Sequence, residues 1–124
     1  MRLPASASSA TRARSEVTRR LAHRLTVGAL EDVRLLLTEL ITNALRHSDM
    51  VPGDEIGVRA ELTDSTIRIE VHDPGRDGTV EVRRPGPQGG GYGLILVDRL
   101  TDQWGVERED GTTVWAELSA GPDR

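Results

Sequence analysis

The sequence has no cysteine and almost no aromatic side chains. Of its 124 residues none is Cys or Phe, one is Tyr and two are Trp. Without cysteine, neither a disulfide nor a thiolate metal site is available. Aliphatic side chains must therefore fill the core, and a chain of this length builds one core but not two. We expect one domain over residues 9–119, with loose ends at residues 1–8, where Arg2 and Leu3 are candidates for a short strand, and at residues 120–124.

Long apolar runs and an excess of positive charge are also missing. No apolar run approaches the roughly 20 residues that span a bilayer, and the N-terminal MRLPASASSATRAR lacks the apolar middle of a signal peptide. The net charge of -4 and the pI near 5.4 argue against a nucleic-acid surface, which is usually basic. These absences predict a cytoplasmic protein that contacts neither membrane nor nucleic acid directly.

Two segments have the periodicity of amphipathic helices, over residues 9–25 and 30–47. Their apolar stripes consist of Ala10, Ala13, Val17, Leu21 and Leu25, and of Val33, Leu36, Leu37, Leu40, Ile41 and Ala44. Arginines at positions 12, 14, 19, 20 and 24 lie opposite the first stripe. We interpret them as a solvated helix face, with a partner surface as the alternative.

The period then changes to two. EIGVRAEL and TIRIEV each alternate apolar and polar residues, which predicts a hairpin with one buried face. Residues 73–91 form a long aperiodic loop, a short helix follows over 93–100, and strands are predicted over 103–108 and 112–119. This order predicts an α+β fold, a two-layer sandwich with helices packed on one face of a mixed, mostly antiparallel sheet.

Glu39 and Asn43, in TELITNALRH, are four residues apart and therefore neighbours on one helix face. That face borders the apolar stripe. Carboxylate and amide oxygens suit Mg²⁺, and a glutamate also orients or deprotonates a hydroxyl group. The alternative is a solvated glutamate and an asparagine near a helix end, which is the commoner arrangement.

Two further segments carry candidate chemistry. In HDPGRDG, Asp73 follows a predicted strand, where it is either a turn residue or an acceptor for a ligand amine, with Gly75 allowing close approach. In QGGGYGLILVDRL, Gly89, Gly91 and Gly93 precede a helix start, which suits a polyphosphate, whereas a hinge is the alternative. The segment matches neither the P-loop nor the Rossmann pattern.

In chain order these segments resemble the ATP-binding boxes of the GHKL superfamily, whose domains have the Bergerat fold. TELITNALRH resembles the N box, HDPGRDG and GGGYGLILVDRL the two glycine boxes, and GTTVWAEL the closing G-T motif. Within the superfamily the chain is most similar to actinobacterial anti-sigma-factor serine/threonine kinases. The resemblance covers about residues 9–119, and four boxes in order are far more specific than any one.

The resemblance implies a role for each matching residue. Asn43 would ligate Mg²⁺, Glu39 would act as general base, and Asp73 would bind the adenine amino group with Gly75 beside it. The remaining implied nucleotide contacts are Gly89, Gly91, Gly93 and Leu94 in the phosphate loop and helix start, Thr112 near the base, and Arg46 and His47 toward the phosphates.

By the same resemblance, the protein would transfer phosphate from ATP to a Ser or Thr of a small STAS-type antagonist and control a sigma factor. The resemblance also implies a homodimer as one assembly. One departure is Asp77, which occupies the second glycine place of the first glycine box. A catalytically inactive nucleotide-binding module is therefore the alternative. An ATPase without a protein substrate and a split histidine kinase also stay open.

Overall fold

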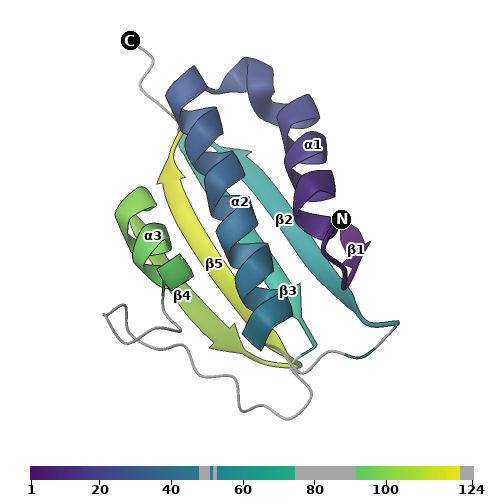
Figure 1. The fold of residues 1–124 in the computed structure, drawn as a ribbon. Coiled ribbons are helices and arrows are strands. Elements are labelled where there is room, and N and C mark those ends of the chain that lie inside the picture. Colours follow the sequence, from purple (N-terminus) through teal and green to yellow (C-terminus); the bar gives the residue numbers. More distant parts are fainter. Residues whose placement is uncertain (48–50, 52, 75–91, 121–124) are drawn as a thin grey trace.

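The computed structural model describes residues 1–47, 51, 53–74 and 92–120. The elements in chain order are β1 Arg2–Pro4, α1 Ser9–Leu21, the 3-10 turn η1 Ala22–Arg24, α2 Val27–His47, β2 Glu55–Thr63, β3 Thr66–Asp73, α3 Tyr92–Leu100, β4 Gln103–Arg108 and β5 Thr112–Ser119. The strands form one sheet in the order β1-β2-β3-β5-β4, and every neighbouring pair is antiparallel. The helices cover one face of this sheet (Figure 1), as the sequence predicts.

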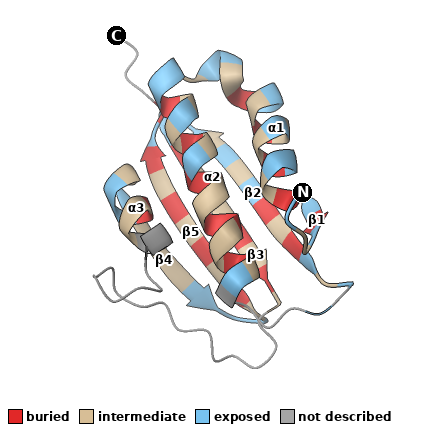
Figure 2. Ribbon diagram, viewed as in Figure 1, coloured by how far each residue is buried: buried red, intermediate tan, exposed pale blue. Residues whose placement is uncertain are grey.

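The core lies between the helices and the covered face of the sheet (Figure 2). Alternate residues of β3 and β5 are buried, which is the period of two that the sequence shows. From the helix layer, α2 contributes most, because its apolar stripe faces the sheet. The largest fully buried side chains in the two layers include Leu36, Leu37, Leu40, Ile41, Ile56, Ile67 and Ile69.

The first eight residues contain a short edge strand, which includes the Arg2 and Leu3 that the sequence suggests for a strand within an otherwise loose end. In β1, Leu3 is 3% exposed and lies opposite Ile56 of β2. The Ser9 hydroxyl donates a hydrogen bond to the Pro4 carbonyl, which ties the strand to the start of α1. One apolar side chain and three residues of backbone pairing are therefore enough to attach this segment to the sheet.

The first helix is shorter than the predicted range of 9–25. It ends at Leu21, one 3-10 turn follows, and Leu25 is extended. Thr26 then caps α2, since its Oγ1 accepts a hydrogen bond from the Ala29 N–H at 3.1 Å. The cap starts a second helix axis at the point where the apolar periodicity alone would continue the first.

Two arginine–threonine contacts join the helices α1 and α2. Arg14 Nη1 donates to Thr38 Oγ1 at 2.7 Å, and Arg34 Nη1 donates to Thr18 Oγ1 at 2.6 Å. Arg14 therefore contacts another helix and is not part of a purely solvated face. These contacts also show which flank of α2 faces α1. No helix in the described part of the chain is long and apolar enough to cross a membrane.

Candidate functional site

The candidate residues gather at one end of the sandwich. The C-terminal end of α2, the last residue of β3, the first residue of β5 and the start of α3 all lie toward the same end of the molecule (Figure 1). The antiparallel pairing explains part of this, because β3 ends where β5 begins. Segments as distant in the sequence as the end of α2 at His47 and the start of β5 at Thr112 are brought together in this way.

Asp73 and Thr112 form the most buried polar pair at this end. They lie directly opposite each other in the β3–β5 ladder, and their exposed fractions are 4% and 3%. Each is the residue at which its strand meets the loops. A carboxylate and a hydroxyl group side by side under little solvent can accept and donate hydrogen bonds to a flat polar ligand.

Gly111 brings the start of β5 into close contact with the end of β3. A Cβ atom at this position would lie 2.1 Å from the Asp73 carbonyl oxygen and 2.9 Å from the Pro74 carbonyl oxygen. Its φ is +106°, and that of Asp110 is +55°, both in the left-handed region that Gly adopts readily and Asp tolerates. Only glycine fits this approach without displacing the Asp73 backbone.

Gly111 is not among the predicted site residues. The Asp-Gly pair signals a tight hairpin between β4 and β5, and that signal was available in the sequence. The contact with Asp73 was not, because it depends on which strand lies next to β5. The residue therefore supports the site through the backbone and not through a side chain.

Glu39 and Asn43 lie half-buried on one flank of α2. Arg34 and Thr38 on the same helix contact α1, so the flank with Glu39 and Asn43 faces the other side, where α3 lies (Figure 1). Helices α2 and α3 are in contact. The predicted neighbours on the helix thus lie on the side of α2 that faces α3, the helix of the second glycine box.

Helix α3 begins at Tyr92, so Gly93 and Leu94 lie in its first turn. Its other end is held to the sheet by Trp104, whose indole N–H donates to the Asp98 carboxylate at 3.0 Å. Val97, on α3, is fully buried in the core. The helix is therefore attached through its C-terminal half, and its N-terminal turn adjoins the glycine-rich segment.

The structure describes some of the remaining predicted site residues but not all of them. Arg46 is exposed near the end of α2, and His47 is the last residue of that helix. Gly75, Gly89 and Gly91 lie outside the described residues, as does most of the predicted loop. In the described part of the chain, no cluster of three or more His, Asp or Glu side chains is arranged to hold a metal ion.

Comparison with protein families matches residues 3–118 to the histidine kinase-like ATPase domain. This match covers nearly the whole chain, so the chain belongs to that family, and the resemblance found in the four motifs is confirmed.

Among curated proteins, the chain is 30% identical over 100 residues to the serine-protein kinase RsbW of Staphylococcus epidermidis, covering 68% of this chain and 62% of that protein. It is 28% identical over 99 residues to RsbW of Listeria innocua, covering 69% and 63%. The match therefore spans less than two thirds of these relatives.

Two solved structures have the same fold. The RsbU and RsbW domains of a Mycobacterium tuberculosis protein superpose with a TM-score of 0.71 at 20% identity, covering all of this chain and 33% of that one. The histidine kinase domain of a blue-light activated kinase from Erythrobacter litoralis gives 0.62 at 20% identity, covering 91% and 60%. The α+β sandwich predicted from the sequence is thereby confirmed.

Proposed function

We propose that this protein binds ATP at the end of the sandwich formed by α2, β3, β5 and α3. The observation that supports this most is the buried pair Asp73 and Thr112, held by the close approach of Gly111. A buried carboxylate at a strand end fits the amino group of adenine as a hydrogen-bond donor. The family match supports a nucleotide as the ligand.

The phosphates of ATP would extend from Asp73 toward the gap between α2 and α3. The N-terminal turn of α3 offers unpaired N–H groups there, which favour a polyphosphate. The side-chain oxygen of Asn43 would be the ligand that this chain gives to Mg²⁺, and the phosphate oxygens would complete the coordination. Gly89, Gly91, Arg46 and His47 stay predicted contacts on the phosphate side.

We further propose that the protein is a serine/threonine kinase of the anti-sigma-factor type. The names of its curated relatives support this reading. The hydroxyl oxygen of a partner Ser or Thr would form a bond to the γ-phosphorus, the bond from that phosphorus to the ADP oxygen would break, and Glu39 would take the hydroxyl proton. The phosphorylated partner would be a small STAS-type antagonist, and the sequestered partner a sigma factor.

Calorimetric titration with MgATP tests the binding site. Asp73→Asn should weaken binding by roughly 10- to 100-fold, because a hydrogen bond to a buried charge is lost. Asp64→Asn is the matched control, since Asp64 lies exposed in the turn before β3, at the other end of the strand. Its φ of 56° is one that Asn also tolerates. Equal affinity of both variants would contradict the proposed adenine site.

Transfer of radiolabelled phosphate to a purified STAS-type protein tests the kinase reading. Glu39→Gln should reduce transfer by about 10²- to 10⁴-fold while leaving MgATP affinity nearly unchanged. Glu31→Gln, an exposed position on the same helix, is the control. Binding without transfer or phosphate release in the wild type would favour the catalytically inactive nucleotide-binding module.

A further inference from the structure

Strand β1 covers only the first part of the edge of β2. It pairs with Glu55–Gly57, and Met1 forms two backbone hydrogen bonds with Val58, at 2.7 and 2.8 Å. Strand β2 continues to Thr63. In an antiparallel ladder, alternate residues direct their N–H and C=O groups to the same side. Ala60 and Leu62 therefore point theirs away from β3, as Val58 does, and among the described residues none bonds to them.

Two hollows flank this edge where β1 ends. On the helix side, a hollow of about 190 Å³ is lined by Met1, Val17, Val58 and Ala60, with Glu16 and Arg20 on its rim. On the open face of the sheet, a second hollow of about 460 Å³ is lined by Arg2, Gly57, Arg59, Glu70 and His72. Both include Met1, Val58 and Arg59, so they lie on either side of one strand position.

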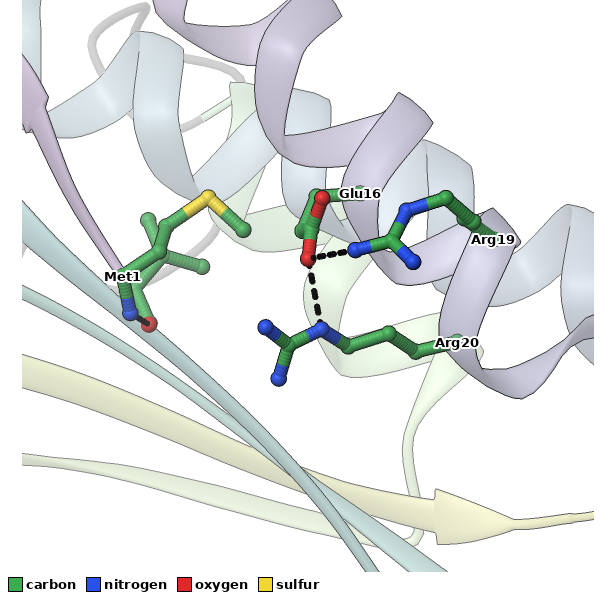
Figure 3. Close-up of polar contacts among 5 residues, drawn as sticks. Met1, Glu16, Arg19 and Arg20 are labelled. Carbon is green, nitrogen blue, oxygen red and sulfur yellow. Dashed lines mark hydrogen bonds and ion pairs between the residues drawn. The ribbon is translucent and has the colours of Figure 1, made fainter.

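The rim of these hollows carries excess positive charge. Glu16 accepts hydrogen bonds from Arg19 at 2.6 Å and from Arg20 at 2.5 Å, so one carboxylate serves two guanidinium groups (Figure 3). Arg59 is exposed and forms no ion pair with any described residue. An incoming segment with an acidic side chain at this point would meet complementary charge.

We propose that the edge of β2 from Arg59 to Leu62 binds an extended segment of a partner protein as an added antiparallel strand. Such a strand would bond to the outward groups of Ala60 and Leu62 and continue the line of β1. Its alternate side chains would enter the two hollows, because successive residues of a strand point to opposite faces.

The register determines the chemistry of the segment. Residues opposite Leu62 and Ala60 face the helix side and are apolar, whereas residues opposite Glu61 and Arg59 face the open side and carry the opposite charges. Because the added strand runs antiparallel to β2, its sequence from N to C is apolar, basic, apolar, acidic. The charges on β2 also reject strands of a different register or polarity.

A second copy of this chain fits the edge less well. Two copies paired antiparallel about Ala60 would set Arg59 opposite Glu61. The next pair would set Leu62 opposite Val58, whose outward groups are already bonded to Met1. A partner segment avoids this conflict. The edge is formed by β2 alone and does not include the nucleotide residues, so its binding requires no ATP.

Nuclear magnetic resonance of the whole protein, without nucleotide, tests the proposal. The probe is the blocked pentapeptide Thr-Val-Lys-Val-Glu, which ends opposite Arg59, with Thr-Val-Glu-Val-Lys as its charge-exchanged control. We expect the first peptide to shift the amide signals of Ala60 and Leu62 and to slow their hydrogen exchange. The control peptide should bind roughly three- to tenfold more weakly, because both cross-strand charge pairs become repulsive.

Two variants make the result specific. The double exchange Arg59→Glu with Glu61→Arg should reverse the preference between the peptides. Ala60→Pro should abolish binding while keeping the sheet, since it removes an N–H that points away from β3. Shifts located elsewhere, no shifts at millimolar peptide, or an unreversed preference would overturn the proposal. So would Ala60 and Leu62 amides that are already protected in the free protein in a concentration-dependent way, because a second copy would then occupy the edge.

Discussion

At the scale of single residues, the position of Asp73 depends on the absence of a Cβ atom at Gly111. Gly111→Ala should lower the free energy of unfolding by about 2 to 4 kcal/mol, because the new Cβ must displace the Asp73 carbonyl and also adopt a positive φ. MgATP affinity should fall with it. Urea denaturation and calorimetric titration measure the two effects.

Gly53→Ala separates the two causes. Gly53 also has a positive φ, +98°, but a Cβ there would meet nothing within 4 Å. This variant should cost only about 1 kcal/mol and leave nucleotide affinity unchanged. If both variants lost stability equally and both kept full affinity, the contact between Gly111 and Asp73 would have no role in the site.

The difference between Gly111 and the predicted site residues shows what a sequence reveals at this scale. Glu39 and Asn43 are predicted because spacing along a helix determines which side chains are neighbours. Asp73 is predicted because a strand pattern ends directly before it. The packing of Gly111 depends on strand order, since β5 lies next to β3, which is distant in sequence, as well as next to its hairpin partner β4. Local patterns carry no such information.

At the scale of elements, the open face of the sheet is held by a charged network across β3, β5 and β4. Glu117 accepts hydrogen bonds from Gln103 at 2.6 Å and from Arg68 at 2.8 Å. Arg68 also binds Glu70 at 2.7 Å and lies over the Trp115 ring, 4.4 Å from its centroid. Hydrogen bonds from Gln103 and then Arg68 hold the pKa of Glu117 below its ordinary value.

This network should make stability depend on pH. Because the pKa of Glu117 is lower in the folded state, its contribution is present above the ordinary glutamate pKa of about 4.3 and is lost as pH falls through the folded value. Glu117→Gln should therefore be less stable than the wild type at pH 7, and the difference should shrink on acidification. Urea denaturation at several pH values measures it.

Glu107→Gln is the control for this pH dependence, since Glu107 is exposed on the neighbouring strand β4 and forms no ion pair with any described residue. It should remain close to the wild type at every pH. A Glu117→Gln deficit that persists unchanged in acid would show that packing, and not the charge of Glu117, is responsible.

The elements themselves were largely predictable, with informative exceptions. The strands over 103–108 and 112–119 have the predicted bounds, because their alternation is regular and an Asp-Gly turn separates them. The first helix was predicted too long, since Leu25 continues the apolar spacing although Thr26 caps a new helix. Strand β1 is suggested by the sequence only at Arg2 and Leu3, because three residues carry almost no periodicity and the pairing of Leu3 with Ile56 of β2 is not visible in them.

At the scale of the whole molecule, one core joins the nucleotide end to the far edge of the sheet. Side chains of β1, β2, β3, β5 and all three helices share a single apolar cluster. A chain with one such core is expected to unfold as one unit. The single domain predicted over residues 9–119 is therefore expected to unfold in one cooperative transition, which can be measured.

MgATP should protect the entire sheet from global unfolding, and not only the strands that form the site. A ligand that binds only the folded state, present at about 100 times its Kd, adds roughly 2.7 kcal/mol to the free energy of unfolding. The most protected amides of β2 should then exchange about 100-fold more slowly, as should those of β3 and β5. Native-state hydrogen exchange with and without MgATP measures this.

Two variants decide how that result is read. Asp73→Asn should reduce the added protection everywhere, to roughly 2- to 11-fold at the same MgATP concentration, whereas Ala60→Pro, which alters only the outer edge, should keep it. If MgATP slowed exchange in β3 and β5 but left β2 unchanged, β2 would unfold separately from β3 and β5. In that case the shared apolar cluster would not make the chain one cooperative unit, and an event at the edge of β2 would have no thermodynamic connection to the nucleotide site.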